Sequence, residues 1–206
     1  MIKLRRNVFE TNSSSSHSIS IRKEGKYITA EELDKMFSWR FRDDGKLLIW
    51  GSDLEFGRSP FEVLANFYDK LRFAIASLGR NDEKRKELEA VMYELIPGLQ
   101  TIDYPTQRDW NTNKKKTYYG YIDHQSLGLL QNFLESHNIS IKEFLTNSRY
   151  VVWIDGDEYN IKEDLFDSGL CHKEDFVEVD AGYSDNDLEW EEYKKEHPDW
   201  DKVDEE

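Results

Sequence analysis

Two segments near the start of the chain, residues 2–8 and 17–22, alternate apolar and polar side chains. In the second segment, Ile19 and Ile21 are separated by a serine. A period of two residues puts successive side chains on opposite faces, which is typical of a half-buried β-strand. A serine-rich run connects the two segments. The chain therefore begins with two predicted strands joined by a polar connection.

Signals for helix starts follow in the next part of the chain. Residues 29–32 form a capping box, in which threonine and glutamate satisfy free N–H groups of the first turn. Residues 59–62, Ser-Pro-Phe-Glu, combine three preferences of a helix N-terminus and predict a long helix that ends at Gly79. Further helices are predicted from about Asn81 to Pro97, from Ser126 to about Asn138, and from Ser140.

Further strands are predicted at residues 47–50, 117–122, 150–154 and 176–179. After residues 150–154, Asp155-Gly156 predicts a tight turn and a hairpin with residues 157–160. We interpret residues 99–116 as irregular. Strands at both ends of the chain, with clustered helices between them, predict an α+β fold with a mostly antiparallel sheet.

A length of 206 residues allows one substantial core with an appendage. We expect a single α+β domain at residues 1–183 and an acidic C-terminal helix or tail at residues 184–206. Apolar residues make up 38% of the chain, so the many charges, and not a missing core, make it hydrophilic.

Negative charge is concentrated at the end of the chain. The net charge is −14, and residues 185–206 hold eleven acidic side chains against three lysines. Such a surface repels the phosphates of nucleic acids, so we expect no direct nucleic-acid binding. Binding of a basic partner, such as a basic host protein, or imitation of a nucleic acid, is the natural opposite.

One cysteine, Cys171, excludes an intramolecular disulfide and a zinc site built mainly from thiolates. Residues 1–6 lack an apolar core long enough for a signal peptide, and no segment approaches the roughly 20 apolar residues of a membrane span. We therefore expect a soluble protein of a reducing, cytosolic setting, with no membrane contact.

The serine-rich run has three open interpretations. In the first, Ser15 is a nucleophile and His17 takes its proton. In the second, hydroxyl and backbone N–H groups hold a phosphate, with a cation nearby. In the third, the run is only a polar connection. The ligand-binding candidates of the second interpretation are Arg6, Glu10, Asn12, Ser13, Ser14 and Ser16.

His124 lies between a predicted strand and a predicted helix, where catalytic residues often occur. Histidine titrates near neutral pH, so His124 is a candidate acid or base. The alternative is a capping segment in which Asp123 and Ser126 satisfy free N–H groups of the helix.

Three carboxylates, Asp155, Asp157 and Glu158, occur within four residues. Hard divalent cations such as magnesium or calcium prefer oxygen ligands, so these residues are a candidate metal site. A plain hairpin turn also explains Asp155-Gly156 and is the favoured interpretation.

Four blocks of the sequence together resemble a family of uncharacterised proteins from bacteriophages and Gram-positive bacteria. The blocks are Phe9–Ser18, Gly51–Gly57, Ile122–Ser126 and Ile154–Tyr159. The second block departs from the pattern of the family, since Arg58-Ser59 follows Phe56-Gly57 here. The resemblance implies an accessory protein of a phage or mobile element, acting in the bacterial cytoplasm, and implies no particular activity.

Three functional hypotheses follow. The first is a small enzyme or ligand-binding protein for a phosphorylated or nucleotide-like molecule, with the serine run, His17, His124 and Asp157 gathered in one pocket. The second is an acidic, non-enzymatic inhibitor that uses residues 185–206 to bind a nucleic-acid enzyme of the host. The third is an interaction module without a site.

Overall fold

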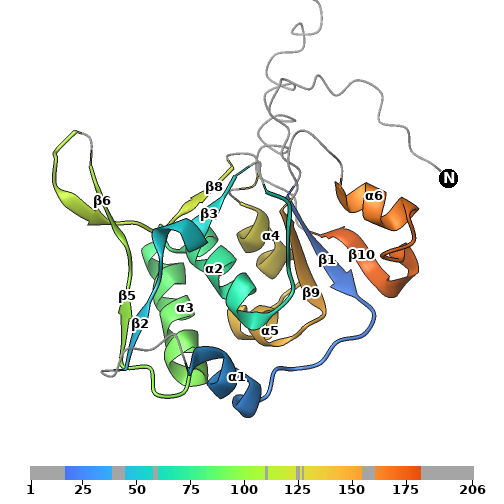
Figure 1. Cartoon of the computed structure of the whole chain (residues 1–206), viewed down its shortest axis with the longest axis horizontal. Helices are drawn as coiled ribbons and strands as arrows, with labels where there is room; N and C mark the ends of the chain where they lie inside the picture. The colour runs from blue at the N-terminus through green and yellow to red at the C-terminus, as the bar shows by residue number, and fades with distance from the viewer. Residues whose placement is uncertain are drawn as a thin grey trace, which may run out of the picture.

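The computed structural model describes residues 17–38, 45–57, 60–109, 111–123, 126, 128–154 and 161–181 (Figure 1). In chain order these residues form β1 (Ser18–Arg22), α1 (Ala30–Phe37), β2 (Lys46–Leu48), η1 (Gly51–Leu54), β3 (Glu55–Phe56), β4 (Glu62–Leu64), α2 (Phe67–Leu78), α3 (Asp82–Leu95), β5 (Thr101–Asp103), β6 (Thr106–Arg108), β7 (Lys115–Thr117), β8 (Tyr121–Ile122), α4 (Leu129–Ser136), α5 (Ile141–Thr146), β9 (Tyr150–Ile154), α6 (Ile161–Asp167), η3 (Lys173–Asp175) and β10 (Phe176–Ala181).

The largest sheet has the strand order β10-β1-β9-β4, and all its pairs are antiparallel. With helices packed around it, this sheet confirms the predicted α+β class. The strands predicted at residues 17–22, 150–154 and 176–179 are confirmed as β1, β9 and β10. The strand predicted at residues 2–8 lies outside the described residues, as does the tail at 184–206.

Residues 157–160, the predicted partner of the hairpin after β9, lie outside the described residues. Trp153 pairs with Ser18 of β1 on one side and with Val63 of β4 on the other. Both edges of β9 are therefore occupied by strands that are distant in sequence. The Asp155-Gly156 signal is local, whereas the pairing of β9 is decided by burial of the whole strand.

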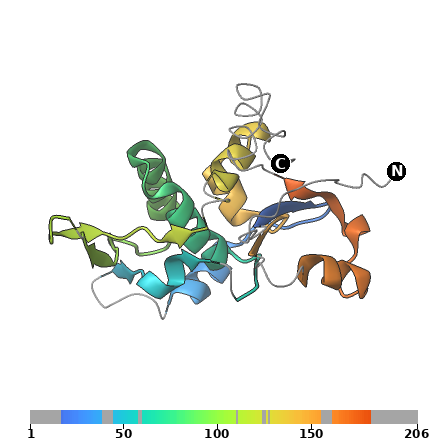
Figure 2. The same ribbon diagram turned by 90° about the horizontal axis from the view of Figure 1, so that it is seen from above.

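The two faces of this sheet belong to different apolar clusters. Val152 and Ile154 contribute to the main core, in which helices α2, α4 and α5 pack, while Val151 and Trp153 face a smaller cluster with Phe166 of α6. Figure 2 shows α6 on the opposite side of the sheet from α4. The all-apolar sequence of β9 thus results from burial on both faces.

Helix α2 begins later than the sequence predicts. Instead of starting at Ser59-Pro60, the chain forms strand β4, and Asn66 caps the helix by accepting a hydrogen bond from the N–H of Asp69. Glu62, expected in the helix cap, forms an ion pair with Arg72. Pairing of β4 with β9 has overridden the local helix signal.

Other helix signals are confirmed. Thr29 and Glu32 form both hydrogen bonds of the capping box of α1. Asn81 caps α3, and Ser140 caps α5. Helix α4 begins at Leu129 rather than directly after Ser126, since the N–H of Ser126 bonds to the carbonyl oxygen of Asp123 and extends a turn.

Residues 99–116, predicted as irregular, contain three short strands. β5 pairs in parallel with β2, and β6 pairs with β7 as an antiparallel ribbon. These strands are polar and three residues long, so no period-two apolar pattern identifies them. In both views the ribbon extends away from the body, on the side opposite the main sheet (Figures 1 and 2).

Candidate ligand-binding site

Most residues singled out from the sequence lie outside the described part of the chain. They are Arg6, Glu10, Asn12, Ser13, Ser14, Ser15, Ser16, His124, Asp155, Asp157 and Glu158. His17 is described. Asp123 and Ser126, which flank His124 and Gln125 in the sequence, are described too. The proposed composite site can therefore be traced through the residues that adjoin it.

His17 and Asp123 meet at one backbone atom. The carbonyl oxygen of Phe56 accepts a hydrogen bond from His17 Nε2 at 3.3 Å and another from the N–H of Asp123 at 3.0 Å. Since a carbonyl oxygen only accepts, Nε2 carries the proton in this contact. Both side chains are buried, with 8% of His17 and 1% of Asp123 exposed. The end of the serine-rich run thus lies beside the residue that precedes His124.

Described residues of all four sequence blocks lie near the start of β1 and the end of β9. Phe56 and Ile122 pair in the parallel β3–β8 ladder. His17 precedes Ser18, whose partner Trp153 precedes Ile154. The first block is more than one hundred residues from the third and fourth in sequence, yet the described residues of the four blocks converge here.

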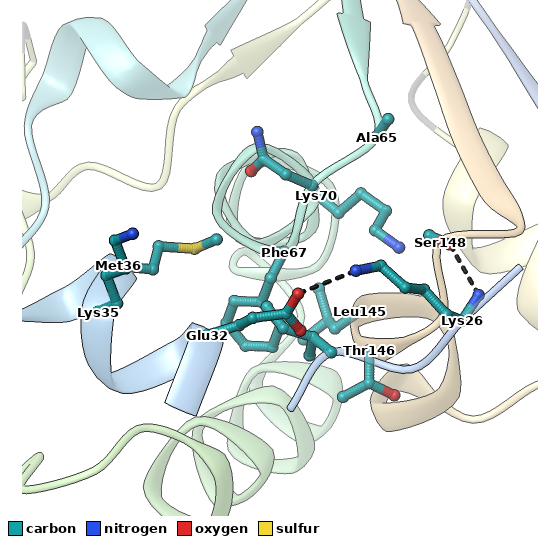
Figure 3. A pocket seen from close by; sticks show the side chains of 12 residues that line it. Lys26, Glu32, Lys35, Met36, Ala65, Phe67, Lys70, Leu145, Thr146 and Ser148 are labelled. Carbon is teal, nitrogen blue, oxygen red and sulfur yellow. Dashed lines mark hydrogen bonds and ion pairs between the residues drawn. The ribbon is translucent and has the colours of Figure 1, made fainter. Parts of the chain in front are cut away.

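A separate cavity of about 600 Å³ opens between α1, the N-terminus of α2 and the C-terminus of α5 (Figure 3). This volume falls in the range of small-molecule sites. The apolar part of its wall comes from Ile28, Met36, Ala65, Phe67 and Leu145. None of these residues was predicted as part of a site.

One wall of the cavity is built by pairing of two loops. The N–H of Lys26 donates to Ser148 Oγ at 2.9 Å, and the N–H of Ile28 donates to the carbonyl oxygen of Thr146 at 2.8 Å. Gly25 permits this close approach, because a Cβ there would lie 2.7 Å from the backbone nitrogen of Arg149. The wall is therefore fixed by backbone contacts.

Lys70 also lines the cavity and is 1% exposed. Its Nζ donates to the carbonyl oxygens of Phe144 and Asn147, both at 2.7 Å. These carbonyls belong to the C-terminal end of α5, where a cation is favoured by the helix dipole. Burial lowers the pKa of Lys70 to about 7, and the charge of Glu143 opposes the shift. Lys70 is therefore first a cap of α5.

The rim of the cavity is more basic than the chain as a whole. Glu32 Oε1 forms an ion pair with Lys26 Nζ at 2.9 Å, which Figure 3 marks with a dashed line. The pKa of Glu32 is lowered to about 2, chiefly by its hydrogen bond from the Thr29 N–H and then by Lys26. Lys35 has no carboxylate partner among the described residues. Three lysines and one glutamate line the cavity, in a chain of net charge −14.

Sequence reasoning missed this site for a physical reason. Its residues come from loops and helices that are far apart along the chain, and the lining has no motif. One signal was present: Lys70 interrupts the apolar residues of α2, in which eight of the other eleven residues are buried. A lysine in such a helix indicates an internal acceptor or a cavity.

Among the described residues, no group of three or more histidine, cysteine, aspartate or glutamate side chains is arranged to hold a metal ion. The candidate metal ligands Asp155, Asp157 and Glu158 are not part of that set. No helix of the described chain is both long and apolar enough to cross a membrane. Comparison of the chain with models of protein families, with curated proteins and with solved structures gave no match.

Proposed function

We propose that this chain binds a small phosphorylated or nucleotide-like molecule in the cavity between α1, α2 and α5. One observation carries the proposal: an apolar cavity of about 600 Å³ has three lysines and one carboxylate in its lining. An apolar body would pack against Phe67 and Met36, and an anionic group would lie at Lys35 and Lys26. The cavity volume is in the range of small-molecule sites, which includes a nucleoside monophosphate.

The positions of the lysines support this assignment. Lys35 lies on the cavity side of α1, beside Met36 (Figure 3). Lys26 is held by Glu32 and is exposed, so it can exchange this weak surface ion pair for a phosphate. Hydrogen bonds between a phosphate and a lysine are charge-assisted and stronger than those between neutral groups.

Thermal unfolding with added AMP tests the proposal. Bound AMP should raise the melting temperature by mass action, and adenosine, which lacks the phosphate, should raise it less. Lys35→Glu should weaken AMP binding about tenfold, since it replaces a charged hydrogen-bond donor by a like charge. Titration calorimetry gives the dissociation constants.

The matched control is Lys86→Glu, which makes the same charge change at an exposed position of α3 outside the cavity. It should leave AMP binding unchanged. Equal shifts of the melting temperature with AMP and adenosine would show that the phosphate does not contribute to binding. Equal losses of AMP affinity in Lys35→Glu and Lys86→Glu would show that AMP does not bind in the cavity.

A second candidate is favoured by the contact of His17 and Asp123 with one carbonyl oxygen. We propose that His17 moves a proton for a phosphorylated substrate at the end of the sheet where the four sequence blocks meet. Inorganic phosphate should shift the imidazole NMR signals of His17 and leave those of the exposed His172 unchanged. His17→Gln assigns the signals, and unshifted His17 signals at saturating phosphate would reject the idea.

The biological setting remains part of the proposal. The resemblance of the four blocks supports an accessory role in a phage or mobile element. The alternative of an acidic inhibitor depends on residues 185–206, which lie outside the described residues. That alternative predicts that deletion of these residues abolishes binding to a basic partner, whereas AMP binding in the cavity should survive the deletion.

A further inference from the structure

The β6–β7 ribbon carries an excess of positive charge on this acidic chain. Residues 106–117 contain one arginine, three lysines and a single aspartate. All six residues of the two strands are exposed. The ribbon extends from the body in both views (Figures 1 and 2). It therefore contributes side chains to the surface, and very few to the core.

The register of the ribbon places like charges opposite each other. Arg108 pairs with Lys115, and Thr106 pairs with Thr117. Directly opposite residues share one face, and residues two apart along a strand share it too. One face thus presents a guanidinium, an ammonium and two hydroxyl groups. Like charges in opposite positions destabilise a ribbon, so folding alone does not account for this pair.

The single carboxylate of the ribbon is engaged on its turn. Asp109 accepts hydrogen bonds from the N–H of Asn111 at 3.1 Å and of Thr112 at 3.0 Å. It also forms an ion pair with Lys116 at 3.1 Å. No described carboxylate lies within ion-pair distance of Arg108 or Lys115. The positive charge of that face is therefore not neutralised within the described chain.

We propose that the β6–β7 ribbon binds the phosphate backbone of double-stranded DNA through Arg108 and Lys115. A two-stranded ribbon fits the major groove, and arginine, lysine and threonine are common phosphate ligands. Three residues per strand, at about 3.3 Å each, put the turn about 10 Å beyond the base of the ribbon. That distance is about one Debye length, so the acidic body is partly screened from the DNA.

The positive charge of the ribbon is local, whereas the repulsion of nucleic acids expected from the net charge of −14 concerns the surface as a whole. An anion between Arg108 and Lys115 would remove their mutual repulsion. Arg108 is already oriented, because its Nη1 donates to Asn113 Oδ1 at 3.1 Å. The ribbon and the cavity share no residues, so the two proposals can fail separately.

Fluorescence anisotropy with a labelled 20-base-pair duplex tests the ribbon, using the full chain. Wild type should bind at low salt, with affinity that falls as salt rises. The double variant Arg108→Glu/Lys115→Glu should bind at least tenfold more weakly and lower the salt slope by about two. The matched control, Lys84→Glu/Lys86→Glu on α3, changes the net charge equally and should retain binding.

Three outcomes would overturn the proposal. The first is no binding of the duplex by wild type at low salt. The second is equal weakening in the ribbon variant and the α3 control, which would indicate a general charge effect. The third is competition by polyglutamate as effective as that by unlabelled duplex at equal charge concentration, which would indicate an acidic protein partner. Circular dichroism should show both double variants folded, since all four side chains are outside the core.

Discussion

The cavity wall and the β6–β7 ribbon both carry lysines, but the two regions use them in opposite ways. In the wall, Lys70 is 1% exposed and bonds to two carbonyl oxygens of α5. In the ribbon, Lys115 is exposed and faces Arg108. The first lysine is tied to the fold, and the second can be changed at little cost. A loss of binding therefore has a different meaning in each region.

The largest effect is expected from Phe67→Ala. Phe67 is 2% exposed, lines the cavity and packs edge-on against Phe37 at 5.9 Å between ring centroids. Its truncation should lower the free energy of unfolding by about 4 kcal/mol. Urea unfolding measures this. A cost below that of a surface substitution would show that the cavity wall is not part of the core.

Lys70→Met should cost about 2 kcal/mol at pH 7, because two buried carbonyl oxygens of α5 lose their donor. Its matched control is Lys86→Met on the exposed face of α3, which should change the free energy of unfolding by less than about 0.5 kcal/mol. Urea unfolding of both variants gives the difference. Equal changes in the free energy of unfolding would show that Lys70 does not stabilise the end of α5.

The pH dependence of Lys70 sharpens the same contrast. Its pKa is lowered to about 7 in the folded state, so the unfolded chain binds more protons between pH 7 and about 10.5. The cost of burying Lys70 is therefore present below pH 7 and is lost as pH rises. Wild type should gain about 2 kcal/mol over Lys70→Met between pH 7 and pH 8.5. A constant difference would mean that Lys70 stays charged.

The ribbon should respond locally and weakly. Asp109→Ala removes the acceptor of the turn amides of Asn111 and Thr112, so these amides should exchange faster with solvent while the core amides do not change. Hydrogen exchange followed by NMR measures both sets. Faster exchange in the main sheet after this change would show that the stability of the ribbon and of the core is coupled, which would contradict the contrast.

The smallest effect is expected from Lys115→Glu alone. It replaces a like-charge pair with Arg108 by an opposite-charge pair, which should raise ribbon stability by a few tenths of a kcal/mol. The same variant should weaken DNA binding. A variant that is slightly more stable and binds less well would show that Lys115 is present for binding.

The sequence predicted elements whose signals are local. The capping box at Thr29, the caps at Asn81 and Ser140, and the apolar strand at Tyr150–Ile154 are all confirmed. The α+β class followed from their order. What failed was the helix start at Ser59, because residues 62–64 pair with β9 as strand β4. Pairing partners depend on burial of the assembled sheet, which no short window contains.

The candidate sites show the same division. The composite site of the serine-rich run and His124 stays a prediction, because both lie outside the described residues. The residues that adjoin them, His17 and Asp123, both contact the carbonyl oxygen of Phe56. The cavity was not predicted, because its apolar lining residues are ordinary core residues in sequence terms. The ribbon was not predicted because its strands are polar and short. The negative net charge of the chain also gave no indication of the positive charge on this segment.

The strand order β10-β1-β9-β4 also constrains synthesis of the protein. β1 needs β9 on one edge and β10 on the other, and these partners are made more than one hundred residues later. Until the ribosome has passed Ala181, the edge of β1 that later pairs with β10 is unpaired, and an unpaired edge is a template for aggregation. The chain therefore cannot complete its fold from the N-terminus onward. It depends on slow, long-range closure after β10 has been made, when a chaperone would be most useful.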